Sequence, residues 1–196
     1  MARAQQRGFV GGSMSARGHM EIGLAFASAV TELGAGRVAD LGSGGGVPGL
    51  MVAAAADQPQ VMLVESLRSR SQFLREAVVE LGLDRASVQE ARAEAVGRDP
   101  RYRGQFSAVT ARGFGPPAVL AECAAPLLGP DGHLLVSEPP AGDGTRWPRE
   151  ALLPLGLVLV DVREGQPAIA VLQRVGPCED RYPRRVGIPG KRPLFG

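Results

Sequence analysis

Residues 40–50 read Asp-Leu-Gly-Ser-Gly-Gly-Gly-Val-Pro-Gly-Leu, and this stretch decides the fold. The apolar run 37–41 leading into it predicts a β-strand, and the small apolar residues after Pro48 predict a helix. The glycines between them allow positive φ and leave bare main chain against which a ligand can lie. Pro48 suits the first turn of a helix, where its missing N–H costs nothing. The stretch therefore predicts a cofactor-binding loop between a strand and a helix.

The loop does not match the two common phosphate-binding patterns. A P-loop needs a Lys-Ser/Thr pair after its last glycine, and residues 47–49 are Val-Pro-Gly. A dinucleotide G-x-G-x-x-G pattern that starts at Gly42 fails at its last position, which is Val47. An acid just before the first glycine, Asp40, suits instead a cationic nucleoside such as S-adenosylmethionine.

A second acid supports this interpretation. Glu65 ends the apolar run 61–65, about one βαβ unit after the loop, where a carboxylate can hold ribose hydroxyls. The alternative is a plain glycine turn and a solvated Glu65. We favour the cofactor site, and we expect Asp40, Ser43, Gly44 and Ser66 to contribute to it.

Composition places the chain among ordinary soluble domains. Its 196 residues suit one domain, 44% of them are hydrophobic, and no apolar run is long enough to span a membrane. Residues 1–20 lack the continuous apolar segment of a secretory signal. Cys123 and Cys178 lack metal-like spacing, so we expect reduced, buried thiols, no metal site and a cytoplasmic protein. A net charge of +2 is too small to indicate a nucleic-acid partner by itself.

The pattern along the chain predicts an α/β fold in three parts. Residues 1–18 are expected to be disordered, 19–176 to form the sheet domain, and 177–196 to form a basic tail rich in Pro and Gly. Within the domain, strands and helices alternate as in a mostly parallel sheet. The expected strands are 37–41, 61–65, 87–90, 106–111 and 133–137, and the expected helices are 21–33, 50–56, 67–81 and 116–128.

The last two strands differ from the rest. Residues 157–162 and 168–173 are separated only by a short turn, so they must form a hairpin with one antiparallel strand. A parallel sheet that is closed by such a hairpin is typical of Rossmann-like class I S-adenosylmethionine-dependent methyltransferases.

The chain resembles a known family in residues 40–50, 63–83, 91–94 and 109–114 and in the tail 181–194, which reads Tyr-Pro-Arg-Arg at 182–185. This is the RsmG/GidB family of bacterial methyltransferases, which modify N7 of a guanine in 16S ribosomal RNA. The resemblance implies a cytoplasmic enzyme that uses S-adenosyl-L-methionine and acts on ribosomal RNA or the small-subunit particle.

The family's cofactor contacts carry over by position. Gly42 and Val47 match contacts along the glycine loop, and Glu65 would hold the ribose. Ala93 and Glu94 match the pair that flanks the adenine, and Arg112 matches an arginine after the fourth strand.

The residue types agree with guanine N7 as the acceptor. N7 bears a lone pair and no proton, so its methylation needs no general base. The sequence offers no His/Asp or Cys/His constellation, since His19 lies near the chain start and His133 begins a strand. We therefore expect catalysis by alignment of donor and acceptor, without a catalytic side chain.

The tail is predicted to bind RNA. Prolines and glycines keep it extended, so that its cations can follow a phosphate backbone, and Tyr182 could stack on a base. The alternative is a tail packed along the domain with solvated arginines. The predicted RNA-binding residues are Arg181, Arg184, Arg185, Lys191 and Arg192.

Two departures from the family keep other functions open. The family has a longer helical region ahead of the loop, and after the fifth strand it shows Lys-Gly where this chain has Glu138 and Pro139-Pro140. Glu138 is expected to weaken phosphate attraction beside the site. The alternatives are a small-molecule methyltransferase on the same fold and a non-catalytic RNA-binding paralogue.

Overall fold

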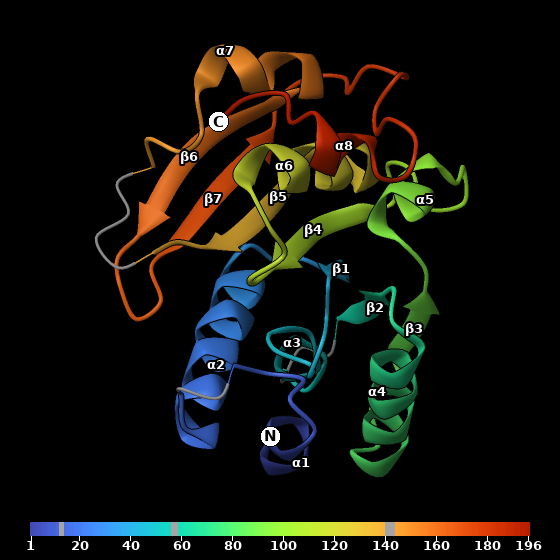
Figure 1. Ribbon diagram of the computed structural model, residues 1–196. Coiled ribbons are helices and arrows are strands. Elements are labelled where there is room, and N and C mark those ends of the chain that lie inside the picture. The colour runs from blue at the N-terminus through green and yellow to red at the C-terminus, as the bar shows by residue number, and fades with distance from the viewer. Residues whose placement is uncertain (12–13, 56–58, 140–143) are drawn as a thin grey trace.

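The computed structural model describes residues 1–11, 14–55, 59–139 and 144–196. A seven-stranded sheet with the order β3-β2-β1-β4-β5-β7-β6 forms its centre (Figure 1). The strands are β1 (Arg37–Leu41), β2 (Gln60–Glu65), β3 (Ala86–Glu90), β4 (Phe106–Ala111), β5 (Leu128–Ser137), β6 (Leu157–Arg163) and β7 (Ile169–Arg174).

The strand directions confirm the predicted fold class. Strands β1 to β5 pair in parallel, whereas β7 lies antiparallel between β5 and β6. Leu41 is in register with both Val64 of β2 and Ala111 of β4, so the carboxyl ends of three strands meet at one edge. In parallel α/β sheets this edge is where ligands bind.

Helices cover both faces of the sheet (Figure 1). On one face lie α1 to α4 and on the other α5, α6 and α8, and each set encloses an apolar cluster against the strands. The α-helices are α1 (Ala2–Gln6), α2 (Ala16–Glu32), α3 (Gly49–Ala53), α4 (Arg68–Glu80), α5 (Ala93–Arg98), α6 (Pro117–Ala124), α7 (Arg149–Leu152) and α8 (Ile188–Lys191). Two 3₁₀ turns, η1 (Ala125–Leu127) and η2 (Leu153–Leu155), follow α6 and α7.

The expected helices lie close to their predicted positions, with shorter or shifted ends. The helix predicted over 50–56 spans Gly49–Ala53, residues 54–55 form a turn and a bend, and residue 56 lies outside the described residues. The helix predicted over 116–128 ends at Ala124 and continues as η1, because Pro126 cannot extend the α-helical hydrogen bonding. No helix in the described ranges is long and apolar enough to cross a bilayer.

The N-terminal segment corrects an expectation. Residues 1–18 were expected to be disordered, but α1 forms, α2 begins at Ala16, and Ala4 is fully buried. Arg3 pairs with Glu80 of α4 at 2.7 Å, and the ring of Phe9 packs edge-on against Phe73. Contacts between distant parts of the chain therefore order a segment whose own composition is polar.

The C-terminal tail also packs on the domain. Tyr182 is only 5% exposed and belongs to the apolar cluster under α5 and α6, so its ring is not free to stack on a base. Arg103 donates to the carbonyl of Tyr182 at 2.6 Å and Arg98 to that of Pro183 at 3.0 Å. The division of the chain near residues 18 and 176 remains a prediction, but neither flanking segment stands apart from the sheet.

Candidate functional site

The glycine loop needs glycine for its geometry. Gly42 and Gly46 have φ of 70° and 91°, in the left-handed region that side chains rarely adopt. A Cβ on Gly46 would lie 2.3 Å from the Leu50 side chain, and one on Gly42 would lie 3.0 Å from the Phe114 ring. The loop therefore turns tightly at the end of β1 and presents main chain at the ligand-binding edge.

Glu65 fixes this loop from the neighbouring strand. Its side chain is buried at the end of β2, where Oε2 accepts the Gly44 N–H at 3.0 Å and Oε1 accepts the Leu67 N–H at 2.8 Å. A carboxylate oxygen can accept more than one hydrogen bond, so both oxygens keep capacity for hydroxyl donors. Glu65 lines the cavity beside the loop, as the ribose-binding role requires.

The first cavity, of about 430 Å³, joins predicted cofactor residues from three strand ends. Ser66 lies beside Glu65, and Ala93 and Glu94 approach from the start of α5. The C-terminal tail closes the cavity, because Gly187 and Gly190 line it and the Gly187 N–H donates to Glu94 at 3.0 Å. The predicted residues in this cavity are Gly42, Glu65, Ser66, Ala93 and Glu94.

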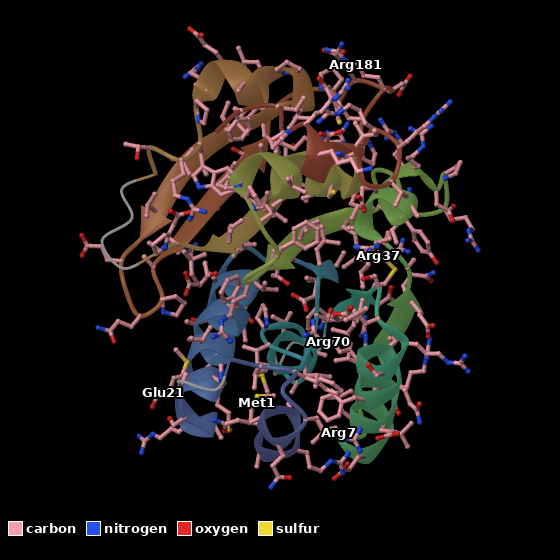
Figure 2. The ribbon with its side chains drawn as sticks, viewed as in Figure 1. Met1, Arg7, Glu21, Arg37, Arg70 and Arg181 are labelled. Carbon is pink, nitrogen blue, oxygen red and sulfur yellow. The ribbon has the colours of Figure 1, made fainter. Side chains whose placement is uncertain are left out.

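A second cavity, of about 540 Å³, lies on the other side of the loop. It shares Gly42, Arg70 and Gly113 with the first, so the two adjoin. Figure 2 shows Arg70 near the middle of the molecule, beside the segment that carries Met1 and Arg7. The predicted residues in the second cavity are Gly42, Ser43, Gly44, Val47 and Arg112.

The N-terminal segment forms one wall of the second cavity, which the sequence did not predict. Phe9, Val10 and Gly11 line it, and a Cβ on Gly45 would lie 2.5 Å from Val10. The available signal was an apolar pair, Phe9-Val10, inside an otherwise polar stretch.

His19 is a second residue that the sequence did not identify. It is 1% exposed on α2, and its Nδ1 lies 2.9 Å from Arg112 Nη1 while its Nε2 lies 3.0 Å from the Gly11 carbonyl. Arginine only donates and a carbonyl only accepts, so His19 holds its proton on Nε2 and accepts from Arg112 on Nδ1. His19 thus links the N-terminal segment to an arginine in the second cavity.

Arg112 carries a charge that no acid in the described chain neutralises. It is half-buried and forms no ion pair with the described residues. Burial lowers the pKa of its guanidinium from the usual value. Because a partly desolvated cation is costly without a counter-charge, Arg112 suits an anionic group in the second cavity.

Asp40 corrects the predicted site, because it lines neither cavity. It is 1% exposed beneath the loop, and its Oδ1 accepts a hydrogen bond from Thr110 at 2.8 Å. Its carboxylate is enclosed by β4 and the start of α3, where a Cβ on Gly49 would lie 2.6 Å from Oδ2. Asp40 therefore supports the loop from below and faces neither cavity.

Two of the five predicted RNA-binding cations are already engaged. Arg184 forms an ion pair with the fully buried Glu122 at 2.7 Å, and Arg181 pairs with Glu179 at 2.8 Å. In contrast, Arg185, Lys191 and Arg192 are exposed and have no ion pair within the described ranges. Of the five predicted cations, these three have no counter-charge within the described ranges.

Glu138 corrects a further expectation about charge. It is 5% exposed, and Arg146 lies 3.5 Å from its Oε2 while Trp147 Nε1 donates to its Oε1 at 2.9 Å. Its charge is therefore enclosed and partly compensated, so it does not oppose phosphate at the surface. Pro139 is described, whereas Pro140 lies outside the described residues.

Other chemistries find little support in the described ranges. No group of three His, Cys, Asp or Glu side chains there could hold a metal ion. Cys123 and Cys178 are free and buried, as predicted, and burial raises the pKa of both thiols. Neither thiol suits a nucleophilic role, since the thiolate is the reactive form.

Several solved structures have a fold similar to that of this chain. A SAM-dependent methyltransferase from Aquifex aeolicus superposes with a TM-score of 0.56 at 16% identity, covering 76% of this chain and 88% of that one. The [4+2]-cyclase SpnF superposes with a TM-score of 0.54 at 24% identity, and the match covers 71% of this chain and 58% of SpnF. Together, the strand order, the glycine loop and the acid that ends β2 show the Rossmann-like fold of class I S-adenosylmethionine-dependent methyltransferases.

Sequence comparison gives the family. A family model for GidB, rRNA small subunit methyltransferase G, matches residues 19–138. The ribosomal RNA small subunit methyltransferase G of Rubrobacter xylanophilus is 36% identical and covers 83% of this chain and 66% of that protein. The protein of the same name from Pelotomaculum thermopropionicum is also 36% identical, and the match covers 79% of this chain and 68% of that protein. The chain belongs to this family, and it spans about two thirds of the length of these relatives.

Proposed function

We propose that this protein methylates N7 of a guanine in the 16S ribosomal RNA of the small subunit. The observation that carries the proposal is the pair of adjoining cavities at the carboxyl edge of the sheet, with Glu65 between the glycine loop and the first cavity. Family membership supports the choice of ribosomal RNA as the substrate.

The residues of both cavities fit S-adenosylmethionine. Glu65 would hold the ribose hydroxyls, and Ala93 and Glu94 would flank the adenine in the first cavity. Ser43, Gly44 and Val47 would hold the amino-acid end in the second cavity, where the uncompensated Arg112 suits its carboxylate. When bound, this cofactor would supply an electrophilic methyl group to the lone pair of guanine N7, and the purine would take up the positive charge of the sulfonium.

The chain contributes alignment and exclusion of water, without proton transfer. N7 has no proton to remove, and no general base is required. Holding the methyl donor and the acceptor in line lowers the activation barrier by several kcal/mol by itself. The tail and the N-terminal segment each form part of the wall of one cavity and would shield the bound cofactor from solvent.

Exposed cations around the first cavity indicate where the RNA would bind. Arg185, Lys191 and Arg192 lie on the tail beside the first cavity, and Arg68 and Arg92 are exposed near its rim without ion pairs in the described chain. Cations of this kind bind phosphate without reading sequence. They would therefore hold the RNA across the mouth of the cofactor site.

The experiment compares Glu65→Ala with Glu90→Ala. Glu90 is the register neighbour of Glu65 on β3, but it lines neither cavity and pairs with Arg75 instead. We expect Glu65→Ala to weaken S-adenosylhomocysteine binding at least tenfold in calorimetry, whereas Glu90→Ala binds as the parent does. Small subunits from a strain that lacks the modification should gain 7-methylguanine, mapped by reduction and aniline cleavage. Methyl incorporation at another atom would overturn the proposal, as would unchanged cofactor affinity in Glu65→Ala.

A further inference from the structure

A third cavity lies where a methyl acceptor would meet the cofactor site. It measures about 260 Å³ and is lined by the carboxyl ends of β4 and β5, with Ala111 and Val136 from the two strands. It shares Gly113 and Phe114 with the first cavity. At about 30 Å³ per water molecule it has room for roughly nine waters, the scale of one purine base rather than a whole nucleotide.

Glu138 gives this cavity an acceptor with unused capacity. Glu138 lies in the cavity wall with its side chain fully enclosed behind Arg146 and Trp147, and Trp147 donates only to Oε1. Oε2 is buried and makes no hydrogen bond, with Arg146 Nη1 at 3.5 Å. A buried acceptor without a donor is costly, so this oxygen suits a ligand that brings an N–H.

Aromatic side chains complete the cavity. Trp147, which is 4% exposed, and Phe114 both line it. Proteins that recognise individual bases of RNA stack them on aromatic rings and bind their edges by hydrogen bonds. A carboxylate together with two aromatic rings is therefore suited to a flat ring that carries adjacent N–H donors.

Building on the proposed function, we propose that this cavity reads the target guanine, whose N1–H and N2–H donate to the Glu138 carboxylate. Guanine alone among the four RNA bases places two N–H donors side by side on its Watson–Crick edge. Adenine and cytosine place a ring acceptor beside their amino group, and uracil flanks its single N–H with carbonyls. N7 lies on the opposite edge, so it stays free to react.

Two features of the structure allow this arrangement. The Arg146 side chain is 38% exposed, so it can turn outward and give Oε2 to the base. Methylation at N7 leaves a positive charge on the purine, and a fixed carboxylate on the other edge stabilises that charge as it develops. Glu138 thus serves guanine selection and the reaction together.

Trp147 provides the test, because it is the only tryptophan in the chain. GMP, IMP and AMP are titrated into the protein bound to S-adenosylhomocysteine, and tryptophan fluorescence is followed. We expect saturable quenching by GMP, with at least tenfold weaker binding of AMP. IMP, which lacks the 2-amino group, should bind more weakly than GMP, and this measurement needs no variant.

Glu138→Gln is the matched variant, and Glu150→Gln, at an exposed position on α7, is its control. Glu138→Gln should lose the preference for GMP over AMP while binding S-adenosylhomocysteine within twofold of the parent, and Glu150→Gln should keep both. Equal binding of GMP and AMP by the parent would overturn the inference as non-specific stacking, and so would wild-type methylation of ribosomal RNA by Glu138→Gln. Absence of methyl transfer by the parent, with GMP preference intact, would instead refute the proposed function alone.

Discussion

Asp40 lies beneath the glycine loop with its carboxylate enclosed. Burial raises the pKa of this carboxyl from 3.8 to about 6, and the hydrogen bond from Thr110 opposes the shift only in part. The folded chain therefore binds this proton more tightly than the unfolded chain does. Stability from this group is fully present below about pH 4 and is lost as the pH rises to about 6.

Asp40→Asn should remove this dependence. Two pH units correspond to about 3 kcal/mol of unfolding free energy, which the parent should lose between about pH 4 and 6 and the variant should retain. Urea unfolding at several pH values measures both curves, and their difference isolates Asp40 from the other carboxyls. Asp84→Asn, in an exposed turn, controls for the loss of one acid. Parallel curves for parent and Asp40→Asn would contradict the assignment.

At the scale of elements, the tail is held to α6 by one buried acid. Glu122 is fully buried and accepts the Arg184 main-chain N–H at 2.8 Å, Nε at 2.9 Å and Nη2 at 2.7 Å. Arg184 Nη2 also donates to the Arg192 carbonyl at 2.7 Å, which fixes the end of α8. The pair thus holds the segment whose glycines line the first cavity.

The tail cations should therefore divide into two groups. Arg184→Ala leaves Glu122 buried and unpaired, so we expect a loss of about 3–5 kcal/mol of stability and weaker cofactor binding. A triple variant should leave stability and cofactor binding unchanged and weaken binding of 16S ribosomal RNA. It combines Arg185→Ala, Lys191→Ala and Arg192→Ala. Filter binding at several salt concentrations should show the logarithmic salt slope reduced by about 0.7 for each phosphate that the variant no longer neutralises. A reduced slope in Arg184→Ala, with stability intact, would reverse the assignment.

At the scale of the molecule, the two ends of the chain approach one edge of the sheet from opposite faces. The N-terminal segment lies with α1 to α4, and the tail lies with α5, α6 and α8 (Figure 1). Figure 2 accordingly shows Arg7 and Arg181 on opposite sides of the sheet. Each end forms part of the wall of one cavity, so the proposed cofactor site depends on segments about 180 residues apart in sequence.

Removal of residues 1–13 should test this dependence. The sheet and the cluster under α6 involve none of these residues, and Ala4 is the one fully buried core residue that they give to the cluster on the other face, so circular dichroism should show a folded chain. Loss of the wall formed by Phe9 and Val10, and of the Gly11 carbonyl that orients His19, should weaken S-adenosylhomocysteine binding about tenfold, or 1.4 kcal/mol. His19→Ala in the full chain isolates the Arg112 contact and should account for part of the loss. Full affinity in the truncated protein would show that the segment only covers the loop.

Local patterns explain why much of the sheet was predictable. The strand at 106–111 and the antiparallel hairpin were expected from short apolar runs and turn residues, and both are present. The short helices α1, α5 and α8 were not expected, because helices of four to six residues are too short to show a period or to form alone. These short helices form because side chains from distant elements pack against them.

The sequence alone determined the parallel sheet, its closing hairpin, and the position of the glycine loop opposite Glu65, because each depends on neighbouring residues and the period of a strand. Only the tertiary structure decided which polar residues line the cavities. It enclosed Asp40 and paired Arg184 with Glu122. It also placed Phe9 and Glu138 at the cavities and set His19 against Arg112. Burial and pairing depend on contacts between segments far apart in the chain, and residue spacing carries no record of those contacts.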